Sequence, residues 1–564
     1  MYFAGPNYLD FRDLYVTCLQ LATTVGVAIS VVISVDRLVH VLKYFQIKIS
    51  SRIRGSSPAE KFRFKSLPEP VNFSHMYPRV AVQLPMFNER YVCQDIINAA
   101  CSLSWPRNRL MVQVLDDSTD KETRQLVDEK VMEWRDRGVN CVCIRRTNRQ
   151  GYKAGALREG FELLISYEYI AIFDADFKPK SDFLHRTIPY LQCNDELGYV
   201  QTRWEFENPD ESYLTKAQEM SLNFHMKCEQ FVHSTYGSFF NFNGTAGVWR
   251  RSCIESAGGW NGRTTVEDMD LSLRAYLGGW RALFLDDTTC MNQLPSSFSA
   301  YRKQQHRWTC GPIQLWSRAS AAIWASKISL LSKVELNIMY FFMRKSVMHF
   351  ASFGFFCFLV PLSVFTPEVS IPMWALVQLP VTVTLTTALF TPNGWAYAIP
   401  YVLFENAMGI VRVTAAVTGI FDLGRAHEWI VTQKAGRKEH CRPCARTWIR
   451  LYVAETLMSI FMLACASHAA FAIHRWMFSV FIFLQGITFL AFGVNAVDCG
   501  GLLGRRVYSV ERALRGIENV IATPRALRQS KAPDTHEQWT PLISKRCNSL
   551  STTCKRIPCI TISA

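Results

Sequence analysis

Two aspartates separated by one residue, Asp174 and Asp176, directly follow the apolar run Tyr169–Phe173. Two carboxylates at the end of a buried strand can bind one divalent cation, and Mg²⁺ or Mn²⁺ held in this way is usually shared with phosphate oxygens. An isolated Asp-x-Asp is more typical of a loop that caps a helix. Four further motifs change that balance. They are Asp116-Asp117, Lys153-Ala-Gly155, Thr265-Val-Glu267-Asp268 and Gln304-Gln-His-Arg307-Trp308.

The first two of these motifs could bind the two ends of a nucleotide. Asp116 and Asp117 end an expected strand, where they could accept hydrogen bonds from a base or ribose, or could cap a helix. Lys153 lies just before an expected helix, so its ammonium group and the backbone N–H groups could bind phosphate at the positive helix terminus. A flexible loop with a solvated lysine is an equal alternative.

The other two motifs could act on sugars. Asp268 is a candidate general base at the start of an expected helix, where the helix dipole lowers its basicity and nearby acids such as Glu267 raise it. Gln304 and Trp308 stand four residues apart on one helical face, with Arg307 beside them. The indole could stack on a sugar ring while the other two side chains bind hydroxyls or phosphate. A basic interfacial helix at a membrane surface is the alternative.

Strands and helices alternate between Arg79 and about Ser326, and these elements must position the motifs. The expected strands are Val80–Leu84, Met111–Leu115, Cys141–Ile144 and Tyr169–Phe173, separated by helices near Glu89–Ser102, Lys121–Arg137 and Gly155–Ser166. The alternation predicts an α/β fold with a doubly wound, mostly parallel sheet. Ligands of such sheets bind beyond the carboxyl ends of the strands. The motifs Asn88-Glu89, Asp116-Asp117 and Asp174-Ala-Asp176 should therefore converge on one crevice.

Apolar runs outside this region predict a multi-pass membrane protein. Leu14–Val35 has no charged residue and is long enough to cross a bilayer, and its length favours a retained anchor over a cleaved signal peptide. Four more runs lie near the C-terminus, namely Ser346–Phe365, Ile371–Phe390, Leu451–Ile473 and Trp476–Val497. The run Ala396–Ile420 carries Glu405 and Arg412, and we expect it to lie in the interface, where both charges stay hydrated.

Basic loops predict the topology and account for the charge. Segments 37–65 and 425–450 and the tail after Val497 are rich in Lys and Arg. The positive-inside rule places all three in the cytosol, which requires five spans. The net charge of +15 therefore needs no nucleic acid, because much of it flanks spans where it attracts anionic lipid. The 18 cysteines form no disulfide framework, and a single Cys441-x-x-Cys444 pair is more often structural than zinc-binding.

Taken together and in this order, the motifs resemble those of the family 2 processive glycosyltransferases, and within them the cellulose-synthase-like A and C groups of plants. The likeness covers roughly residues 75–500. The phrases that carry it are Gln83–Arg90, Gln113–Asp120, Gly151–Leu157, Phe173–Phe177, Phe242–Arg250, Arg263–Leu271, Gln304–Trp308 and Glu428–Lys434.

The resemblance implies a GT-A-like α/β domain with a doubly wound mixed sheet. This domain would be inserted between one N-terminal and about four C-terminal transmembrane helices, accompanied by interfacial amphipathic helices, in the Golgi membrane. The implied domains are an anchor at 1–36, a basic linker at 37–78, the glycosyltransferase domain at 79–325 with its Gln-x-x-Arg-Trp helix, a transmembrane region at 326–500 with a cytosolic loop at 391–450, and a basic, partly disordered tail at 501–564.

The resemblance also implies a role for each motif. The donor-binding residues would be Asn88, Glu89, Asp116, Asp117, Lys153 and Arg307. The catalytic residues would be the base Asp268 together with Asp117, Asp174 and Asp176, and the last two would bind Mg²⁺ or Mn²⁺. The acceptor-binding residues would be Gln304, Trp308, Gly244 and Thr245. Many relatives carry Tyr where Phe87 stands, so a hydroxyl contact to the base is absent or replaced.

The implied reaction is an inverting transfer in one displacement, in which Asp268 deprotonates the acceptor 4-hydroxyl as it attacks the anomeric carbon. The phrases Met86–Arg90 and Gly155–Leu157 look more like the A group. They favour GDP-mannose as donor, with GDP-glucose as a second donor, and a β-1,4-linked mannan or glucomannan product. The alternative is the C-group reaction, which makes a β-1,4-glucan (xyloglucan) backbone from UDP-glucose.

Two further alternatives stay open at the level of sequence. A membrane scaffold could retain a dead transferase domain, although the intact acidic motifs argue against this. A transferase that adds single sugars is the other, and Trp308 and the clustered spans weigh against it. The sequence leaves open the polymer length and whether a second copy or an accessory subunit binds. Charge bias favours a cytosolic active site.

Overall fold

The computed structural model describes residues 7–55, 58–68, 74–423 and 451–497. Three features of the sequence analysis lie outside the described residues. They are the Glu428–Lys434 phrase, the Cys441/Cys444 pair and the tail beyond Val497.

The described chain forms a mixed sheet with the strand order β3-β2-β1-β4-β7-β6-β8-β5. The strands are β1 (Val80–Met86), β2 (Leu110–Asp116), β3 (Cys141–Ile144), β4 (Tyr169–Ile172), β5 (Lys178–Pro179), β6 (Leu197–Phe206), β7 (Gly247–Arg250) and β8 (Arg281–Asn292). Strands β3, β2, β1 and β4 run parallel, as the alternation predicts, whereas β7 is antiparallel to both of its neighbours. The carboxyl ends of the four parallel strands therefore meet along one edge.

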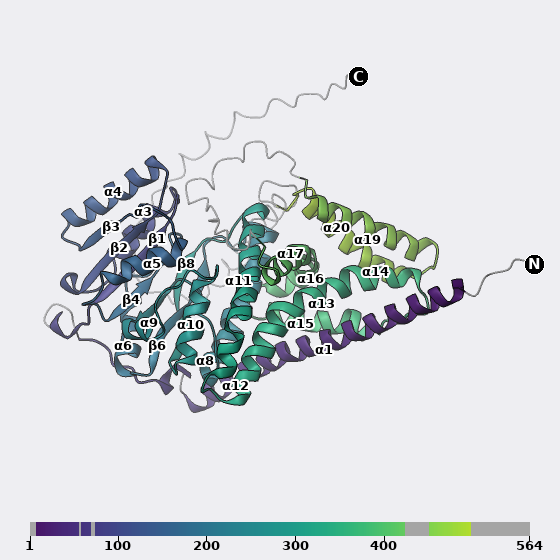
Figure 1. The fold of residues 1–564 in the computed structure, drawn as a ribbon, viewed down its shortest axis with the longest axis horizontal. Coiled ribbons are helices and arrows are strands. Elements are labelled where there is room, and N and C mark those ends of the chain that lie inside the picture. Colours follow the sequence, from purple (N-terminus) through teal and green to yellow (C-terminus); the bar gives the residue numbers. More distant parts are fainter. Residues whose placement is uncertain (1–6, 56–57, 69–73, 424–450, 498–564) are drawn as a thin grey trace, which may run out of the picture. The chain divides into compact units, whose positions relative to one another are not determined.

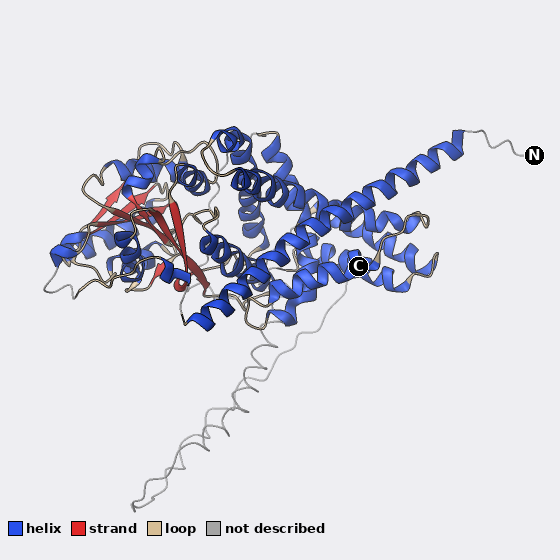
Figure 2. Ribbon diagram, turned by 90° about the horizontal axis from the view of Figure 1, so that it is seen from below, coloured by secondary structure: helices blue, strands red, loops and turns tan. Residues whose placement is uncertain are grey.

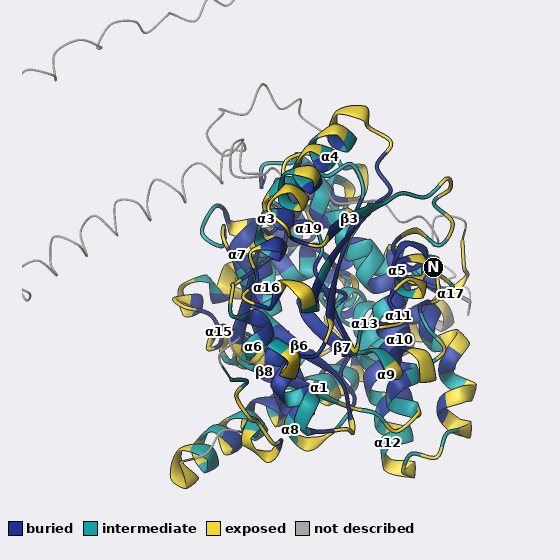
Figure 3. Cartoon of the chain, turned by 90° about the vertical axis from the view of Figure 1, so that its left-hand side faces the viewer, coloured by how far each residue is buried: buried dark blue, intermediate teal, exposed yellow. Residues whose placement is uncertain are grey.

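Helices cover both faces of this sheet. They include α3 (Cys93–Cys101), α4 (Lys121–Asp136), α5 (Tyr152–Glu162), α6 (Phe183–Cys193), α9 (Arg251–Ser256) and α10 (Glu267–Leu277). Figure 3 shows α3 and α6 on one side of the strands and α5, α9 and α10 on the other. Asp120 caps α4, because its side chain accepts a hydrogen bond from the backbone N–H of Thr123.

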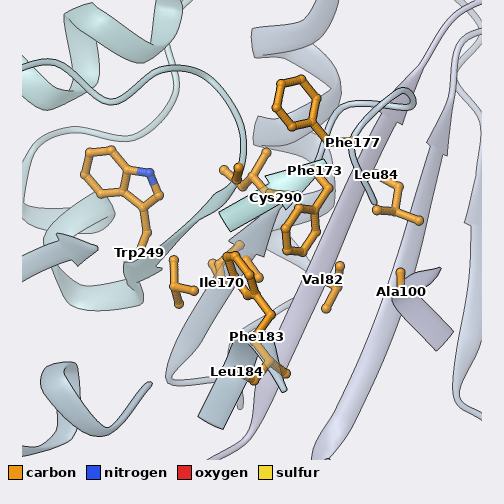
Figure 4. Packing of buried hydrophobic residues seen from close by; sticks show 14 of the residues in the cluster. Val82, Leu84, Ala100, Ile170, Phe173, Phe177, Phe183, Leu184, Trp249 and Cys290 are labelled. Atoms are coloured by element: carbon orange, nitrogen blue, oxygen red, sulfur yellow. The ribbon is translucent and has the colours of Figure 1, made fainter. Parts of the chain in front are cut away.

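Apolar side chains from the sheet and its helices form one continuous core, part of which Figure 4 shows. Val82, Leu84, Ile170 and Phe173 have no exposed surface at all. Fully burying a side chain of this kind contributes roughly 1.5–3 kcal/mol. The core thus fixes the strand ends on which the polar motifs stand.

Five helices in the described part of the chain are long and apolar enough to cross a membrane. They are Phe11–Arg54, Leu330–Phe365, Gly394–Ile420, Val453–Phe471 and Trp476–Gly493. Figure 2 shows the strands gathered in one region and the long helices in another. In four cases the helix contains or closely matches an expected span, which fits a membrane protein.

The fifth helix differs from the expectation. Gly394–Ile420 has the length of a span, whereas the apolar helix Trp374–Ala388 falls short of it. Glu405 accepts hydrogen bonds from Arg412 at 2.6 and 3.0 Å, so the two charges satisfy each other within the helix pair α16 (Ala398–Ala407) and α17 (Gly409–Ile420). A hydrogen-bonded ion pair needs less water than two separate charges, and for this reason the charges do not confine the segment to the interface.

Helix α11 (Phe298–Ala325) contacts both the sheet domain and the long helices (Figure 1). Two glycines allow the close approach. A Cβ at Gly311 would lie 2.5 Å from Val266 Cγ1, and one at Gly419 would lie 2.9 Å from the carbonyl oxygen of Cys310. Helix α11 thereby packs directly against the segment before α10 and against α17.

Candidate active site

A cavity of about 130 Å³ brings most of the expected site residues together at the carboxyl edge of the sheet. Its lining includes Glu89, Lys153, Asp174, Asp176, Gly244, Asp268, Gln304, Arg307 and Trp308. These residues come from segments more than 200 positions apart, so their convergence is a property of the fold. The crevice predicted from the strand–helix alternation is present.

Lys153 lies at the centre of the charged part of this cavity. Its Nζ lies 2.5 Å from Asp174 Oδ1, 3.0 Å from the Gly244 carbonyl oxygen and 3.8 Å from Glu267 Oε1. Burial alone would lower the pKa of Lys153, but the charges of Asp174 and Glu267 outweigh it and raise the pKa. The lysine therefore stays protonated at the start of α5, where an anion would also meet the helix N-terminus.

Asp268 is half-buried beside the buried Glu267 in the first turn of α10. Burial raises the pKa of Asp268 to about 7, the charge of Glu267 adds to this rise, and the charge of Lys153 opposes it. Burial likewise raises the pKa of Glu267. A carboxyl with a pKa near neutrality is suited to general-base catalysis. In the structure, burial and the charge of Glu267 therefore outweigh the opposing charge of Lys153.

The loop 241–246 closes the cavity on the side of Asp268. Gln230 and Asn243 exchange two side-chain hydrogen bonds, at 2.8 and 2.9 Å, and Gln201 accepts one from the Asn243 backbone N–H. Gly244 has φ = 80° and leaves a gap that a Cβ would fill at 3.0 Å from Asp268 Oδ2. Thr245 is buried, and its hydroxyl accepts the backbone N–H of Asp174 at 2.9 Å, so it positions that aspartate instead of lining the cavity.

Trp308 and its neighbours on α11 form the opposite wall, as expected from their helical spacing. The ring of Trp204 on β6 lies 6.4 Å from that of Trp308, centroid to centroid. Thr265 Oγ1 and Asn292 Oδ1 are buried at this wall without a hydrogen-bond partner among the described residues. Trp204 and Asn292 were not singled out from the sequence, and Thr265 was named only as part of the motif that contains Asp268. An alternating pattern in 197–206 was the one available signal, and β6 and β8 were not recognised as strands.

Three residues that were expected to contact the nucleoside form hydrogen bonds to other groups of the protein instead. Asp116 has no exposed side-chain surface and binds Arg145, 2.9 Å away. Asp117 accepts hydrogen bonds from Arg146 at both oxygens. The side-chain oxygen of Asn88 accepts the backbone N–H groups of residues 119 and 120, so it fastens the loop after β1 to the loop after β2. None of the three lines the 130 Å³ cavity.

The aspartates after β4 fit a hard divalent cation. No group of three or more His, Cys, Asp or Glu side chains among the described residues is arranged to hold a metal on its own. Asp174 and Asp176 offer only oxygen ligands beside an open cavity, and Mg²⁺ or Mn²⁺ commonly completes such a shell with phosphate oxygens and water. A cation here would need its remaining ligands from the substrate.

A second cavity, of about 300 Å³, shares Asp268, Gln304 and Trp308 with the first and reaches Asp36 and Glu405 on the candidate spans. A third, of about 160 Å³, shares Glu405 with the second and lies between the spans. Neighbouring cavities thus share lining residues. Together the three extend from the carboxylates to the candidate membrane-spanning helices.

Comparison with known proteins agrees with this geometry. Residues 78–311 match the family model described as Glycosyltransferase like family 2. Glucomannan 4-beta-mannosyltransferase 1 of Oryza sativa subsp. japonica is 41% identical over 497 residues, which is 86% of this chain and 94% of that protein. Glucomannan 4-beta-mannosyltransferase 9 of Arabidopsis thaliana is also 41% identical over 497 residues, with 86% and 92% covered.

Among solved structures, a mannosyltransferase from Pyrobaculum calidifontis in complex with GDP-Man and Mn²⁺ aligns with 71% of this chain and 99% of its own, at 18% identity and a TM-score of 0.49. The identity to the plant proteins is high, and it extends over nearly their whole length. The chain therefore belongs to the family of the glucomannan 4-β-mannosyltransferases, the cellulose-synthase-like A group of the family 2 glycosyltransferases.

Proposed function

We propose that this protein is a membrane-embedded inverting glycosyltransferase that extends a β-1,4-linked mannan or glucomannan backbone from GDP-mannose. Membership of the family supports the sugar and the linkage. The observation that carries the proposal is a single cavity shared by a half-buried carboxyl of raised pKa, Asp268, a buried ammonium, Lys153, and the paired carboxylates of Asp174 and Asp176. A direct displacement at a sugar carbon uses a base for the acceptor hydroxyl and positive charge at the leaving diphosphate, and these groups can supply both.

Asp268 is the general base of the proposed reaction. Its carboxylate accepts the proton of the acceptor 4-hydroxyl while that oxygen forms a bond to the anomeric carbon of the donor, and the bond from this carbon to the diphosphate breaks. The configuration inverts because the attack comes from the face opposite the leaving group. The acceptor sugar would lie between Gly244 and Trp308, with Gln304 beside it.

The leaving diphosphate gains negative charge as the bond breaks. Lys153 is already charged and buried, so it stabilises that charge without reorganising water. Arg307 lies across the same cavity and would bind the diphosphate from the other side. Mg²⁺ or Mn²⁺ bound by Asp174 and Asp176 would neutralise further charge on it.

The nucleoside would extend from Lys153 toward Glu89 and the loops after β1, β2 and β3. Asp117 remains our candidate for hydrogen bonds to the base, because a carboxylate held by an arginine keeps lone pairs for further donors. Asn88 and Asp116 would act by shaping those loops. This division of roles departs from the direct contacts that the resemblance implies for all three residues.

The connected cavities support a path for the product. A polymer that leaves the site past Trp308 would enter the space lined by Asp36 and Glu405 and then pass between the spans. We propose a Golgi membrane location with the active site on the cytosolic side, and the domain boundaries given by the sequence. Protease protection of an epitope placed near Asn208 tests the orientation, and protection of that epitope in sealed vesicles would refute it.

The central test is incorporation of labelled sugar by the purified full-length protein. With GDP-mannose and Mn²⁺ we expect a polymer that β-mannanase degrades, and we expect Asp268→Asn to reduce incorporation by about 100-fold or more. Asp195→Asn is the matched control, because this side chain is fully exposed. Incorporation from UDP-glucose alone would refute GDP-mannose as the donor. Equal rates for the Asp268 variant and wild type would refute Asp268 as the general base. No sugar transfer from any donor would favour the alternative of a membrane scaffold.

A further inference from the structure

Arg149 stacks on an aromatic ring at the nucleoside end of the site, and no role has yet been given to it. The central carbon of its guanidinium, Cζ, lies 3.3 Å from the ring centroid of Phe87 and 5.4 Å from that of Tyr152. Phe87 directly follows β1, and Arg149 follows β3. Both residues therefore belong to the carboxyl edge of the sheet, where ligands of this fold bind.

The backbone holds Arg149 in this place at a cost. Gly151 and Tyr152 have φ values of 71° and 48°, and Asn88, next to Phe87, has φ = 52°. For residues other than glycine this conformation is unfavourable and persists only where surrounding contacts enforce it. The contacts around these loops therefore hold the stacked pair in a strained backbone conformation.

The guanidinium is not fully satisfied by the protein. Its Nε is buried and has no hydrogen-bond partner among the described residues. The carboxylate of Asp117 lies 4.0 Å from that nitrogen and is already occupied by Arg146. Leaving a guanidinium without a hydrogen-bond partner is unfavourable. Because Nε itself is covered, a ligand acceptor would have to bind the terminal nitrogens of the partly exposed side chain.

We propose that Arg149 determines the base specificity of the donor site by donating two hydrogen bonds to O6 and N7 of guanine. This inference rests on the proposed use of a guanine nucleotide. A guanidinium has donors in its own plane at a spacing that matches these two acceptors, and the pair is the commonest specific arginine–base contact. Uracil presents one acceptor at that edge, and adenine presents an amino group in place of O6.

Phe87 then acts on Arg149 and not on the base. A ring beneath the guanidinium fixes its plane while leaving the N–H groups of the terminal nitrogens at the edge. This role explains why a phenylalanine suffices where many relatives carry tyrosine, since stacking needs no hydroxyl. Asp117, 4.0 Å from Arg149, could accept the N1 and N2 hydrogens of the same base.

The experiment compares nucleotides that differ by one acceptor. Dissociation constants of GDP, UDP and 7-deaza-GDP, in which C–H replaces N7, are measured by calorimetry with the full-length protein in nanodiscs and with Mn²⁺ present. For wild type we expect GDP to bind about tenfold tighter than 7-deaza-GDP. In Arg149→Lys, which keeps the charge and loses the planar pair of donors, we expect this ratio to fall below about twofold.

Matched variants separate the base contact from general effects. Arg158→Lys, an exposed arginine on α5, should retain the wild-type ratio. Phe87→Tyr should retain it as well, whereas Phe87→Ala should lower it, because the platform is lost. The wild-type ratio is informative even if a variant fails to fold.

The outcomes also separate this inference from the proposed donor. If wild type prefers GDP and Arg149→Lys keeps both that preference and the 7-deaza ratio, the role of Arg149 is refuted and the donor stands. Equal weakening of GDP and UDP in Arg149→Lys would assign the arginine to phosphate, which also refutes it. If wild type binds UDP more tightly than GDP, the proposed donor and the role of Arg149 both fall.

Discussion

At the scale of single residues, the site combines opposite charges in a small cavity lined by largely buried side chains. Burial raises the pKa of Asp268 to about 7, and the charge of Glu267 adds to this effect. Lys153 compensates part of the cost, because it remains charged between Asp174 and Glu267. The result is a base that is ionised in a substantial fraction of molecules at neutral pH and still binds protons well.

This pKa predicts the pH dependence of the reaction. The base must be deprotonated, so kcat/KM should fall as the pH drops below about 7, approaching a tenfold loss per pH unit. Glu267→Gln removes the neighbouring charge and should move the acidic limb to lower pH. If the acidic limb of the kcat/KM profile lies at the same pH in Glu267→Gln and in wild type, a group other than Asp268 controls it.

The same residue should cost the protein stability. The pKa of Asp268 is about 7 in the folded state and about 3.9 in an unfolded chain. The folded state therefore binds more protons between these values, and stability falls as the pH rises through this range. Asp268→Asn should raise Tm at pH 8, and the gain should vanish toward pH 4. A lower Tm in the variant at pH 8 would contradict this reasoning.

Gly244 tests how closely the loop must approach the base. In Gly244→Ala the new Cβ would lie 3.0 Å from Asp268 Oδ2, and the residue would keep φ = 80°. Gly259→Ala is a matched control, because its φ is 69° and nothing lies within 4 Å of its added Cβ. Both variants should lose about 1 kcal/mol from backbone strain. Only Gly244→Ala should also lose at least about tenfold in kcat, because small misplacements of reacting groups are costly.

The residues of the site were predictable from the sequence where their role depends on strand ends and helix spacing. Asp174, Asp176 and Lys153 line the cavity because they follow a strand or begin a helix, and Gln304 and Trp308 line it through their spacing on α11. Asp116 and Asn88 could not be placed in this way. Their orientation depends on partners in other loops, such as Arg145 and Thr119, and the sequence does not specify those pairings.

At the scale of elements, local signals predicted the parallel half of the sheet and long-range pairing formed the other half. Strands β1 to β4 alternate with helices, so each is marked by its neighbours in sequence. Strands β6, β7 and β8 were not recognised, because buried polar residues of β6, including Gln201 and Thr202, obscure the strand pattern. We expected Ala396–Ile420 to lie in the interface, whereas the helix Gly394–Ile420 has the length and composition of a span. The ion pair inside it was not foreseen from two charges seven residues apart.

A second ion pair joins elements that are far apart in the chain. Arg344, on η5 (Glu335–Val347), donates to Asp36 on α1 (Asn7–Arg54) at 2.7 and 2.8 Å. Arg344→Met should lower the thermal unfolding midpoint, because a largely buried aspartate loses its partner, at a cost of up to about 3–5 kcal/mol. The double variant Asp36→Asn, Arg344→Met should recover part of this loss. Purely additive effects in a double-mutant cycle would show that the pair is not coupled.

At the scale of the whole molecule, the cavities connect a catalytic domain to a set of membrane spans. Helix α11 is the shared wall, because it carries Trp308 at the site and packs through Gly311 and Gly419 against both regions. With this arrangement, the polymer would move along the cavities by one sugar after each transfer while it stays bound to the protein. The length of the product, and not the rate of a single transfer, should therefore depend on the membrane helices.

Ser34 offers a direct test of that dependence. It is buried on α1 and lines the third cavity, whereas Val32 on the same helix is 44% exposed. Ser34→Trp should fill the space between the spans and shorten the polymer, while GDP release in the first turnovers stays within about twofold of wild type, because Asp268 and Lys153 are untouched. Val32→Trp adds the same ring on the outer face and should leave product length unchanged. Polymers of wild-type length from Ser34→Trp, measured by size-exclusion chromatography, would place the path of the product elsewhere.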